Sequence, residues 1–349
     1  MSDNSAKKYK KDPADEASDR WLSEQKGLAA KRRPLDIALY IKIQTIMRCK
    51  SRFDGIQISC LVTQPEAGTT CKGIVQFAHG MCEHKERYIP FMEFLSRNGY
   101  VCVINDHRGH GESVISSEDL GYFYTGGYEA VVDDLLVVNE EIKKRYPGLP
   151  CYLFGHSMGS LAVRSYIKRH DDTIDGLIVC GSPSANPATG AGKMLTKLIA
   201  AIKGDRHRPA IIQKMAFDGY NKKFSSEGLN AWLSTDKENV RIYNESPLCG
   251  YTFTANGFIG LFNLLQDTYS DKDWKVSKPE LPIHFIAGEE DPCIMSLKDF
   301  DKAVSHMKSH GYTNVTSKTY SGLRHEILNE TGKETVWNDV LTFLEKKFI

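Results

Sequence analysis

Several features are scarce or missing in this 349-residue sequence, and each absence removes a class of protein. No apolar stretch is long enough to span a bilayer, and the first residues are charged rather than apolar. Formal charges almost cancel, with 45 Lys and Arg against 44 Asp and Glu, so no nucleic-acid partner is expected. None of the nine cysteines forms a Cys-x-x-Cys pair, so no metal site is predicted. The odd cysteine count and the lack of a signal peptide predict a cytoplasmic protein with reduced thiols.

Strand and helix patterns alternate through the first half of the chain. Residues 73–78 form a short continuous apolar run, which is typical of a strand buried on both faces. Residues 127–146 have the spacing of a long amphipathic helix. This alternation predicts an α/β fold with a mostly parallel central sheet flanked by helices. The predicted segments are strands at residues 73–78, 100–105, 151–154 and 175–181, and helices at residues 88–97 and 127–146.

Antiparallel strands are expected ahead of this pattern. Residues 56–62 alternate between apolar and polar side chains, which predicts a strand with one buried face. Because Asp54-Gly55 is a hairpin turn signal, a partner strand is expected near the end of residues 37–49. Residues 1–36 are rich in charged residues and serine, and we predict a charged leader there rather than a domain.

The alternation breaks after residue 181. Residues 182–281 contain no clear buried strand, although a return to a parallel sheet needs only about a dozen residues. The sequence therefore predicts a core formed by residues 37–181 and 282–349, interrupted by a mainly helical insertion. The core is expected to be completed by strands at residues 282–287 and 315–320 and helices at residues 298–309 and 334–346.

The strongest chemical signal is the run Gly155-His156-Ser157-Met158-Gly159. An apolar strand ends at Gly155 and helical spacing follows Gly159, so Ser157 falls on a sharp turn. This Gly-x-Ser-x-Gly pattern is typical of a nucleophile elbow, which holds a serine hydroxyl clear of the sheet. The backbone N–H of Met158 would then point toward a substrate oxygen. An ordinary βα turn with a capping serine is the alternative, but the flanking strand and helix favour the nucleophile.

A serine nucleophile needs an adjacent base, and the base needs an orienting partner. Asp291 and His325 each follow a predicted strand, at the edge where a parallel sheet gathers its active site. They also follow the serine in the order Ser, Asp, His. Glu289 and Glu290 remain alternatives for the acid. His156 adjoins the serine, but neighbouring side chains on a tight turn diverge, so it should point elsewhere.

A second donor to the substrate oxygen is expected from the loop after residues 73–78. His79-Gly80-Met81 occupies that loop, where Gly80 lets the backbone turn. The backbone N–H of Met81 is therefore the candidate donor. A plain glycine-containing loop without a role in catalysis is the alternative.

Five motifs together resemble the α/β-hydrolases of the monoacylglycerol lipase and lysophospholipase group, which shares patterns with the serine aminopeptidase family. The resemblance implies Ser157 as nucleophile, Asp291 as acid and His325 as base. It also implies Met81 and Met158 as oxyanion donors, with no cofactor. The motifs are residues 77–80 with Glu83-His84 after them, 106–113, 155–159, 287–291 and 325–326, in family order over about three quarters of the chain.

This resemblance implies a serine hydrolase that cleaves esters of single-chain lipids, such as a monoacylglycerol or a lysophospholipid, through an acyl-enzyme. Residues 106–113 are expected to form a structural loop. Residues 182–281 would form a cap over the acyl pocket. The apolar helical faces at 194–202 and 258–265 would line that pocket or touch a membrane surface transiently. Simple packing of these helices on each other and on the sheet is the alternative.

Two rival functions remain open on the sequence. A serine aminopeptidase-like peptidase needs acidic residues in the cap to hold a substrate ammonium group. A non-catalytic α/β-hydrolase that serves as a binding module is the second rival, and the complete apparent triad argues against it. The candidate ammonium ligands for the peptidase are Glu227, Asp236, Glu238 and Glu245.

Overall fold

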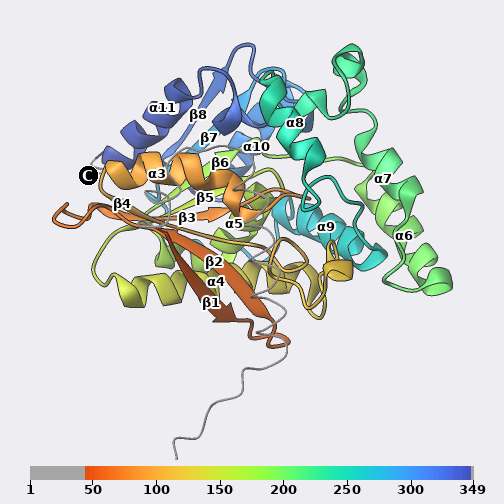
Figure 1. Ribbon diagram of the computed structural model, residues 1–349, viewed down its shortest axis with the longest axis horizontal. Helices are drawn as coiled ribbons and strands as arrows, with labels where there is room; N and C mark the ends of the chain where they lie inside the picture. Colours follow the sequence, from red (N-terminus) through yellow and green to blue (C-terminus); the bar gives the residue numbers. More distant parts are fainter. Residues whose placement is uncertain (1–43, 347–349) are drawn as a thin grey trace, which may run out of the picture. The chain divides into compact units, whose positions relative to one another are not determined.

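The structure is a computed structural model that describes residues 44–346, and the leader predicted for residues 1–36 lies outside that range. An eight-stranded sheet in the order β1-β2-β4-β3-β5-β6-β7-β8 runs through it (Figure 1). β2 pairs with β4 in antiparallel fashion, whereas every pairing from β4 through β8 is parallel, which confirms the mostly parallel sheet. The strands are β1 (Gln44–Lys50), β2 (Gln57–Thr63), β3 (Gly73–Ala78), β4 (Tyr100–Asn105), β5 (Cys151–His156), β6 (Gly176–Cys180), β7 (Ile283–Gly288) and β8 (Val315–Tyr320).

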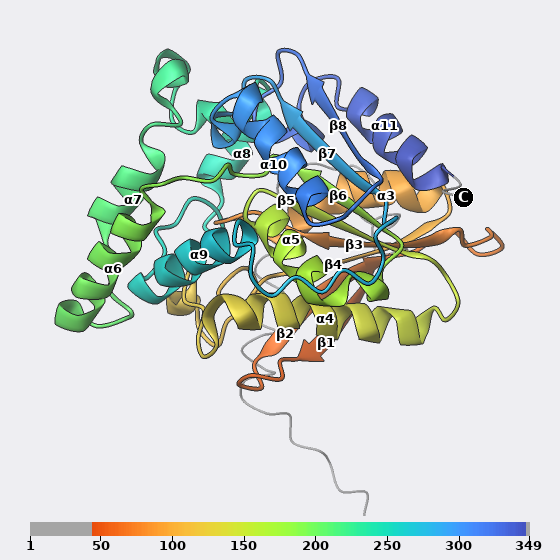
Figure 2. The same cartoon turned by 180° about the vertical axis from the view of Figure 1, so that it is seen from behind.

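Helices cover both faces of the sheet. On one face lie α3 (Ile89–Arg97) and α11 (Glu334–Glu345), where Phe91 and Trp337 contact each other with ring centroids 5.5 Å apart (Figure 1). The other face carries three helices (Figure 2). They are α4 (Gly127–Arg145), α5 (Met158–His170) and α10 (Leu297–Ser309).

β2 is more buried than its alternating pattern predicts. Every residue of the strand after Gln57 is buried, including the polar Ser59 and Thr63. The Ser59 hydroxyl donates to Glu112 at 2.7 Å, and the Thr63 hydroxyl shares a hydrogen bond of 2.7 Å with Ser96. The side of this strand that was expected to face solvent is therefore buried, and the hydroxyls of Ser59 and Thr63 each have a hydrogen-bond partner there.

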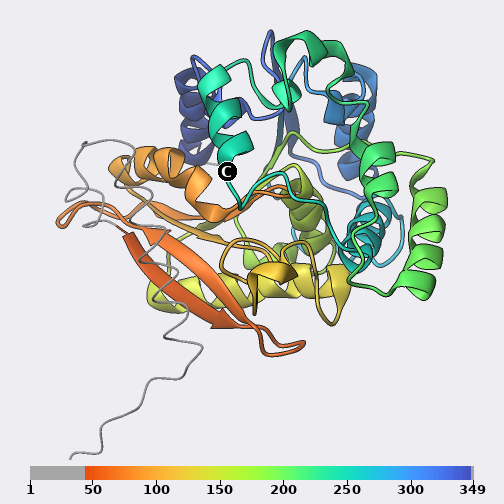
Figure 3. The same ribbon diagram turned by 45° about the vertical axis from the view of Figure 1, so that its right-hand side comes forward.

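Between β6 and β7 the described chain is helical and contains no strand; we call residues 182–281 the inserted segment. Its last helix packs against α4, α5 and α6, while α6 and α7 project at the right of Figures 1 and 3. Within residues 44–346, no helix combines the length and the apolar character that crossing a bilayer requires. The α-helices of the inserted segment are α6 (Thr189–Lys203), α7 (Ala210–Phe217), α8 (Lys237–Glu245) and α9 (Ala255–Thr268).

The apolar face predicted on α6 divides in two. Leu195 and Ile199 are partly buried and pack against the core. Met194, Leu198 and Ile202 point outward, with exposed fractions of 73%, 58% and 74%. The periodicity indicates which residues share one side of the helix, but not which of them pack against the rest of the protein.

Candidate active site

Ser157 lies on the turn between β5 and α5, in a backbone conformation that few non-glycine residues adopt. Its φ of 54° and ψ of −120° store strain of the kind that is found at functional sites. The two flanking glycines are required by close contacts. A Cβ on Gly155 would lie 2.5 Å from the side chain of Val163, and one on Gly159 would lie 2.0 Å from the carbonyl oxygen of Ala78. The elbow therefore tolerates no side chain at positions 155 and 159, two residues before and after the serine.

Asp291 and His325 lie in direct contact, as the sequence predicts. Asp291 follows β7 and accepts a hydrogen bond from the backbone N–H of Cys293 at 2.8 Å. Its other oxygen accepts from Nδ1 of His325 at 2.9 Å, and the two residues are only 3% and 2% exposed. A donating Nδ1 leaves Nε2 of His325 with its lone pair, so the ring is oriented as a general base. The sulfur of Cys293 lies 3.9 Å from this Nε2.

The two alternative acids lie elsewhere. Glu289 accepts a hydrogen bond from the exposed hydroxyl of Thr319 at 3.0 Å. Glu290 is paired with Lys223 at 3.6 Å. Each carboxylate therefore has a surface partner, and Asp291 is the one of the three that bonds His325.

A cavity of about 510 Å³ brings the predicted residues together. Ser157, His325, Met81 and Met158 all contribute to its wall, whereas Asp291 lies behind His325. This volume falls within the usual range for a small-molecule site. The apolar remainder of the wall includes Leu161, Ile212, Met215, Phe217, Leu229, Trp232, Leu233, Leu261, Phe262 and Leu265.

Most of this apolar wall comes from the inserted segment. Leu261, Phe262 and Leu265 of α9 line the cavity, in agreement with one of the two apolar faces singled out in the sequence. The other face, residues 194–202, does not line the cavity, because α6 contributes only Thr189, Ala191 and Gly192 to the wall; membrane contact or simple packing remains open for that face. Gly192 packs near the ring of Phe262, so α9 covers the inward side of α6.

Sequence reasoning missed a buried carboxylate behind the predicted oxyanion loop. Glu83 accepts from the backbone N–H of Gly80 at 2.6 Å and from the hydroxyl of Tyr88 at 3.0 Å. Its second oxygen accepts from Arg87 at 2.7 Å. Burial disfavours a charge on Glu83, but the hydrogen bond with His156 and the charge of Arg87 outweigh it and hold its pKa well below the usual value. Glu83 therefore fixes the loop that carries Met81.

The same network reaches the loop of His325. Arg87 donates to both oxygens of Glu326, at 2.7 and 2.6 Å, and Asn239 of α8 donates to Glu326 at 2.7 Å. His156 lies 3.3 Å from Glu83 and donates through Nε2 to the carbonyl oxygen of His325 at 3.2 Å. Burial opposes a charge on His156, but its bond to Glu83 prevails and raises the pKa of His156. His156 is therefore engaged behind the site, as its place on the turn predicts.

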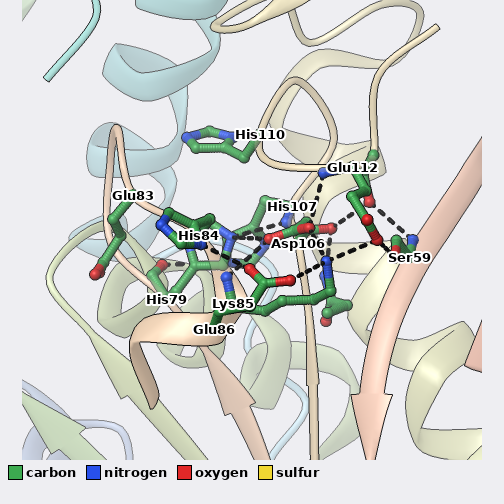
Figure 4. Close-up of polar contacts among 12 residues, drawn as sticks. Ser59, His79, Glu83, His84, Lys85, Glu86, Asp106, His107, His110 and Glu112 are labelled. Carbon is green, nitrogen blue, oxygen red and sulfur yellow. Dashed lines mark hydrogen bonds and ion pairs between the residues drawn. The ribbon is translucent and has the colours of Figure 1, made fainter. Parts of the chain in front are cut away.

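A second polar cluster anchors the loop of residues 106–113 (Figure 4). Lys85 is almost fully buried and donates to Asp106 at 2.6 Å and to Glu112 at 3.0 Å. Burial opposes the charge on Lys85, but Asp106 outweighs it and raises the pKa of the ammonium group. The backbone N–H of His107 donates at 3.0 Å to Nε2 of His79, in the loop predicted to carry the oxyanion donor. The structural role expected for this loop agrees with these bonds.

Two of the sequence motifs contain residues of the polar network around Glu83 and Glu326. The resemblance includes Glu83-His84 and His325-Glu326, but no role was assigned to Glu83 or Glu326 from the residues alone. The bond between Arg87 and Glu326 spans 239 positions of the chain, so no local pattern could predict it.

The sheet, its flanking helices and the serine elbow define an α/β-hydrolase. In agreement, the solved structure of a carboxyl esterase from Bacillus coagulans superposes with a TM-score of 0.78 at 22% identity, over 86% of this chain and 99% of that one. The sequence profile described as "Serine aminopeptidase, S33" matches residues 69–332, and the chain belongs to this family.

Two lipases are similar to this chain over most of their length. A monoacylglycerol lipase of Mycolicibacterium smegmatis is 25% identical over 296 residues, which cover 83% of this chain and 93% of that protein. A monoglyceride lipase of Saccharomyces cerevisiae is 27% identical over 305 residues, which cover 84% and 91%. The resemblance read from the five motifs is thus confirmed.

Proposed function

We propose that this protein is a serine hydrolase that cleaves carboxylic esters of single-chain lipids, such as a monoacylglycerol or a lysophospholipid. The observation that carries the proposal is the mainly apolar cavity of about 510 Å³ on which Ser157 and His325 open together. An apolar wall suits an acyl chain, and the serine supplies the nucleophile for its ester carbonyl. The names of the relatives at 25% and 27% identity support the same substrate class.

The proposed reaction has two halves. Ser157 Oγ attacks the ester carbonyl while Nε2 of His325 takes the hydroxyl proton, and Asp291 stabilises the imidazolium that forms. Collapse of the tetrahedral intermediate expels the alcohol, which takes that proton from His325, and leaves the acyl group on Ser157. Water then attacks the acyl-enzyme with His325 as base, and the fatty acid departs.

The oxyanion of each intermediate is assigned to the backbone N–H groups of Met81 and Met158. Met158 is the first residue of α5, so its N–H has no acceptor within the helix. Met81 follows Gly80, which Glu83 holds at 2.6 Å. A donor that is fixed before the reaction needs no reorganisation when charge develops, and removing one such donor typically costs about 10² to 10³ in kcat.

The inserted segment is proposed as the cap of this site. Its inner side supplies Leu261, Phe262 and Leu265 to the cavity. Its outer side exposes Met194, Leu198 and Ile202, which would make transient contact with a membrane or micelle that holds the substrate.

The four carboxylates that were predicted to hold a substrate ammonium group in a peptidase are bonded to other residues. Glu227 bonds Arg324 at 2.7 Å, Asp236 caps α8, and Glu238 and Glu245 both pair with Arg241. Each of these carboxylates already has a partner, and none contributes to the described wall of the cavity.

Parallel assays of an aryl acyl ester and an aminoacyl anilide test the proposal. We expect turnover of the ester, with inactivation by a fluorophosphonate, and little turnover of the anilide. Three carboxylates among the described residues line the cavity: Glu83 and Glu326 are buried and bonded to Arg87, whereas Asp218 is exposed and pairs with Lys214 only at 3.9 Å. Asp218 is therefore the candidate to hold a substrate ammonium group in a peptidase, and Asp218→Asn serves as a control. Preferred turnover of the anilide that falls with Asp218→Asn would establish the peptidase instead.

A further inference from the structure

Three potential ligand atoms converge on the outer side of α10, away from the cavity. His306 and His310 are separated by four positions, and their Nε2 atoms lie 3.2 Å apart. Oδ1 of Asp271, on the chain that leaves α9, lies 3.6 Å from Nε2 of His306 and 3.3 Å from Nε2 of His310. The histidine side chains are 14% and 11% exposed, whereas Asp271 is 87% exposed. The group is thus half-buried and open on one side.

These separations match the edges of a metal tetrahedron. Zinc binds imidazole nitrogen and carboxylate oxygen at roughly 2.0 to 2.2 Å, which places neighbouring ligand atoms about 3.3 to 3.5 Å apart. The three observed separations are 3.2, 3.3 and 3.6 Å. Neutral imidazoles could each donate an Nε2 proton to Oδ1 of Asp271, whereas a divalent cation at the centre would be bound by a lone pair of all three atoms.

We propose that Asp271, His306 and His310 bind a divalent transition-metal ion of the zinc class. Two neutral imidazoles and one carboxylate are ligands that zinc accepts, and the exposed side leaves a fourth position for water. Two histidines four apart on one helical face provide part of this geometry without rearrangement.

The surroundings hold the ligands in place. Trp274 stacks on the ring of His310, with centroids 4.1 Å apart and planes at 12°. Tyr269 lies 5.6 Å from the ring of His306. The nearby Lys168 donates to Asp267 at 3.1 Å, so its charge is partly balanced by another carboxylate.

Such an ion would connect two parts of the protein. Asp271 belongs to the chain that returns from α9 toward β7, whereas His306 and His310 belong to α10 and its C-terminus. The metal would therefore fasten the end of the inserted segment to α10 of the core, a helix that lies toward the viewer in Figure 2.

The site lies far from the proposed chemistry. Lys168 is ten residues beyond Met158 in α5, which is about 15 Å along a helix axis, and its ammonium group lies 5.5 Å from the ring of Trp274. Metal binding can therefore be measured without reference to catalysis.

The test adds Zn²⁺ to full-length protein that has been treated with EDTA and dialysed, with calorimetry for affinity and thermal unfolding for stability. We expect one Zn²⁺ per chain at this site and a rise in Tm of a few degrees at saturating metal. Asp271→Asn and His310→Gln should each weaken binding at least tenfold. Asp273→Asn is the matched control, because it removes a carboxylate from the same exposed stretch and should leave binding unchanged.

Cobalt distinguishes this site from binding by cysteine. Co²⁺ in the wild type should give the visible absorption of a tetrahedral ion without the strong sulfur-to-cobalt band, and Asp271→Asn should diminish it. The proposal is overturned if the wild type binds no Zn²⁺ at 100-fold excess, or if Asp271→Asn and His310→Gln bind it as the wild type does. Loss in His310→Gln alone would also overturn the three-ligand site.

Discussion

The two sides of the cavity are built from opposite chemistry. On the core side, the loops that carry Met81 and His325 rest on buried charges, among them Glu83, Arg87 and Glu326, each held by several hydrogen bonds. On the side of the inserted segment the wall is mainly apolar, and the outer helix α6 exposes large hydrophobic side chains.

This difference separates two physical requirements. Directional hydrogen bonds hold donor groups and aromatic rings in fixed positions and orientations. Stabilisation of a transition state requires such fixed geometry. Apolar contacts are non-directional, so they can accommodate acyl chains of various shapes. We infer that the core side determines the rate of the chemistry and the inserted segment determines which substrates reach it.

The largest expected effect comes from removing the hydroxyl of Ser157, the proposed nucleophile. Ser157→Ala should lower kcat by about 10⁴ or more, because the hydroxyl that forms the acyl-enzyme is lost while the fold is kept. Steady-state kinetics and circular dichroism measure the two properties. Because the triad acts as a unit, Ser157→Ala with His325→Ala should be little worse than either change alone. Substantial ester turnover by the folded single variant would refute the assignment.

Breaking the buried charges on the core side should cost stability. Lys85→Met leaves Asp106 buried without its cation, and we expect a loss of about 3 to 5 kcal/mol in the free energy of unfolding. Lys72→Met makes the same change in an exposed pair with Glu345 and should cost under about 1 kcal/mol. Urea unfolding compares them, and equal losses would show that the Lys85 cluster is not a structural anchor.

The buried histidines of the core loop 106–113 should make the stability of the protein depend on pH. Burial, assisted by the neighbouring histidines, lowers the pKa of His107 and of His110 to about 3. In the unfolded chain both would titrate near 6.5, so the unfolded state binds more protons between pH 6.5 and 3. The stability that these two neutral residues contribute should therefore be fully present above about pH 6.5. As the pH falls, this contribution should decline by up to about 3 kcal/mol per pH unit, with about 1.4 from each residue.

Single variants test that assignment. His110→Gln should reduce the slope of unfolding free energy against pH by about one proton between pH 6 and 4. His107→Gln should reduce the slope by a similar amount, because the pKa of His107 is also lowered to about 3. If both variants keep the slope of the wild type, the acid sensitivity arises elsewhere.

The smallest expected effect concerns the outer face of α6. Leu198→Asp should change the free energy of unfolding by less than about 0.5 kcal/mol and leave activity on a monomeric ester unchanged. On substrate in vesicles it should lower activity several-fold, because an apolar contact with the lipid surface is lost. Ile115→Asp is the matched control, since Ile115 is 75% exposed outside the inserted segment. An equal loss for both variants would indicate general surface hydrophobicity rather than a docking face.

Much of the core and the proposed triad could be read from sequence because their signals are local. Ser157 lies in a five-residue pattern, and Asp291 and His325 each lie in the loop that follows a recognisable strand. The direction of parallel strands then brings such residues to one edge of the sheet. No long-range information is needed for these predictions.

What the sequence left open depends on partners that are distant along the chain. Arg87 and Glu326 form one bidentate pair only in the folded protein. Leu198 has the periodicity of a buried residue, yet the adjacent Leu195 and Ile199 take the contacts that α9 and the core offer. The carboxylate of Asp271 meets two histidines of another element, so a search for paired cysteines could not find that group.

The dependence of kcat/KM on acyl length tests the division between the two sides most directly. The measurement uses a homologous series of esters below their micelle threshold, with wild type and with Leu261→Asp, which places a charge on the cavity wall. Each buried methylene is worth about 0.8 kcal/mol, so kcat/KM should rise nearly fourfold per methylene and then level off. Leu261→Asp should flatten that rise while sparing a two-carbon ester. A series that is flat in the wild type would contradict the account and remove lipid from the substrate class.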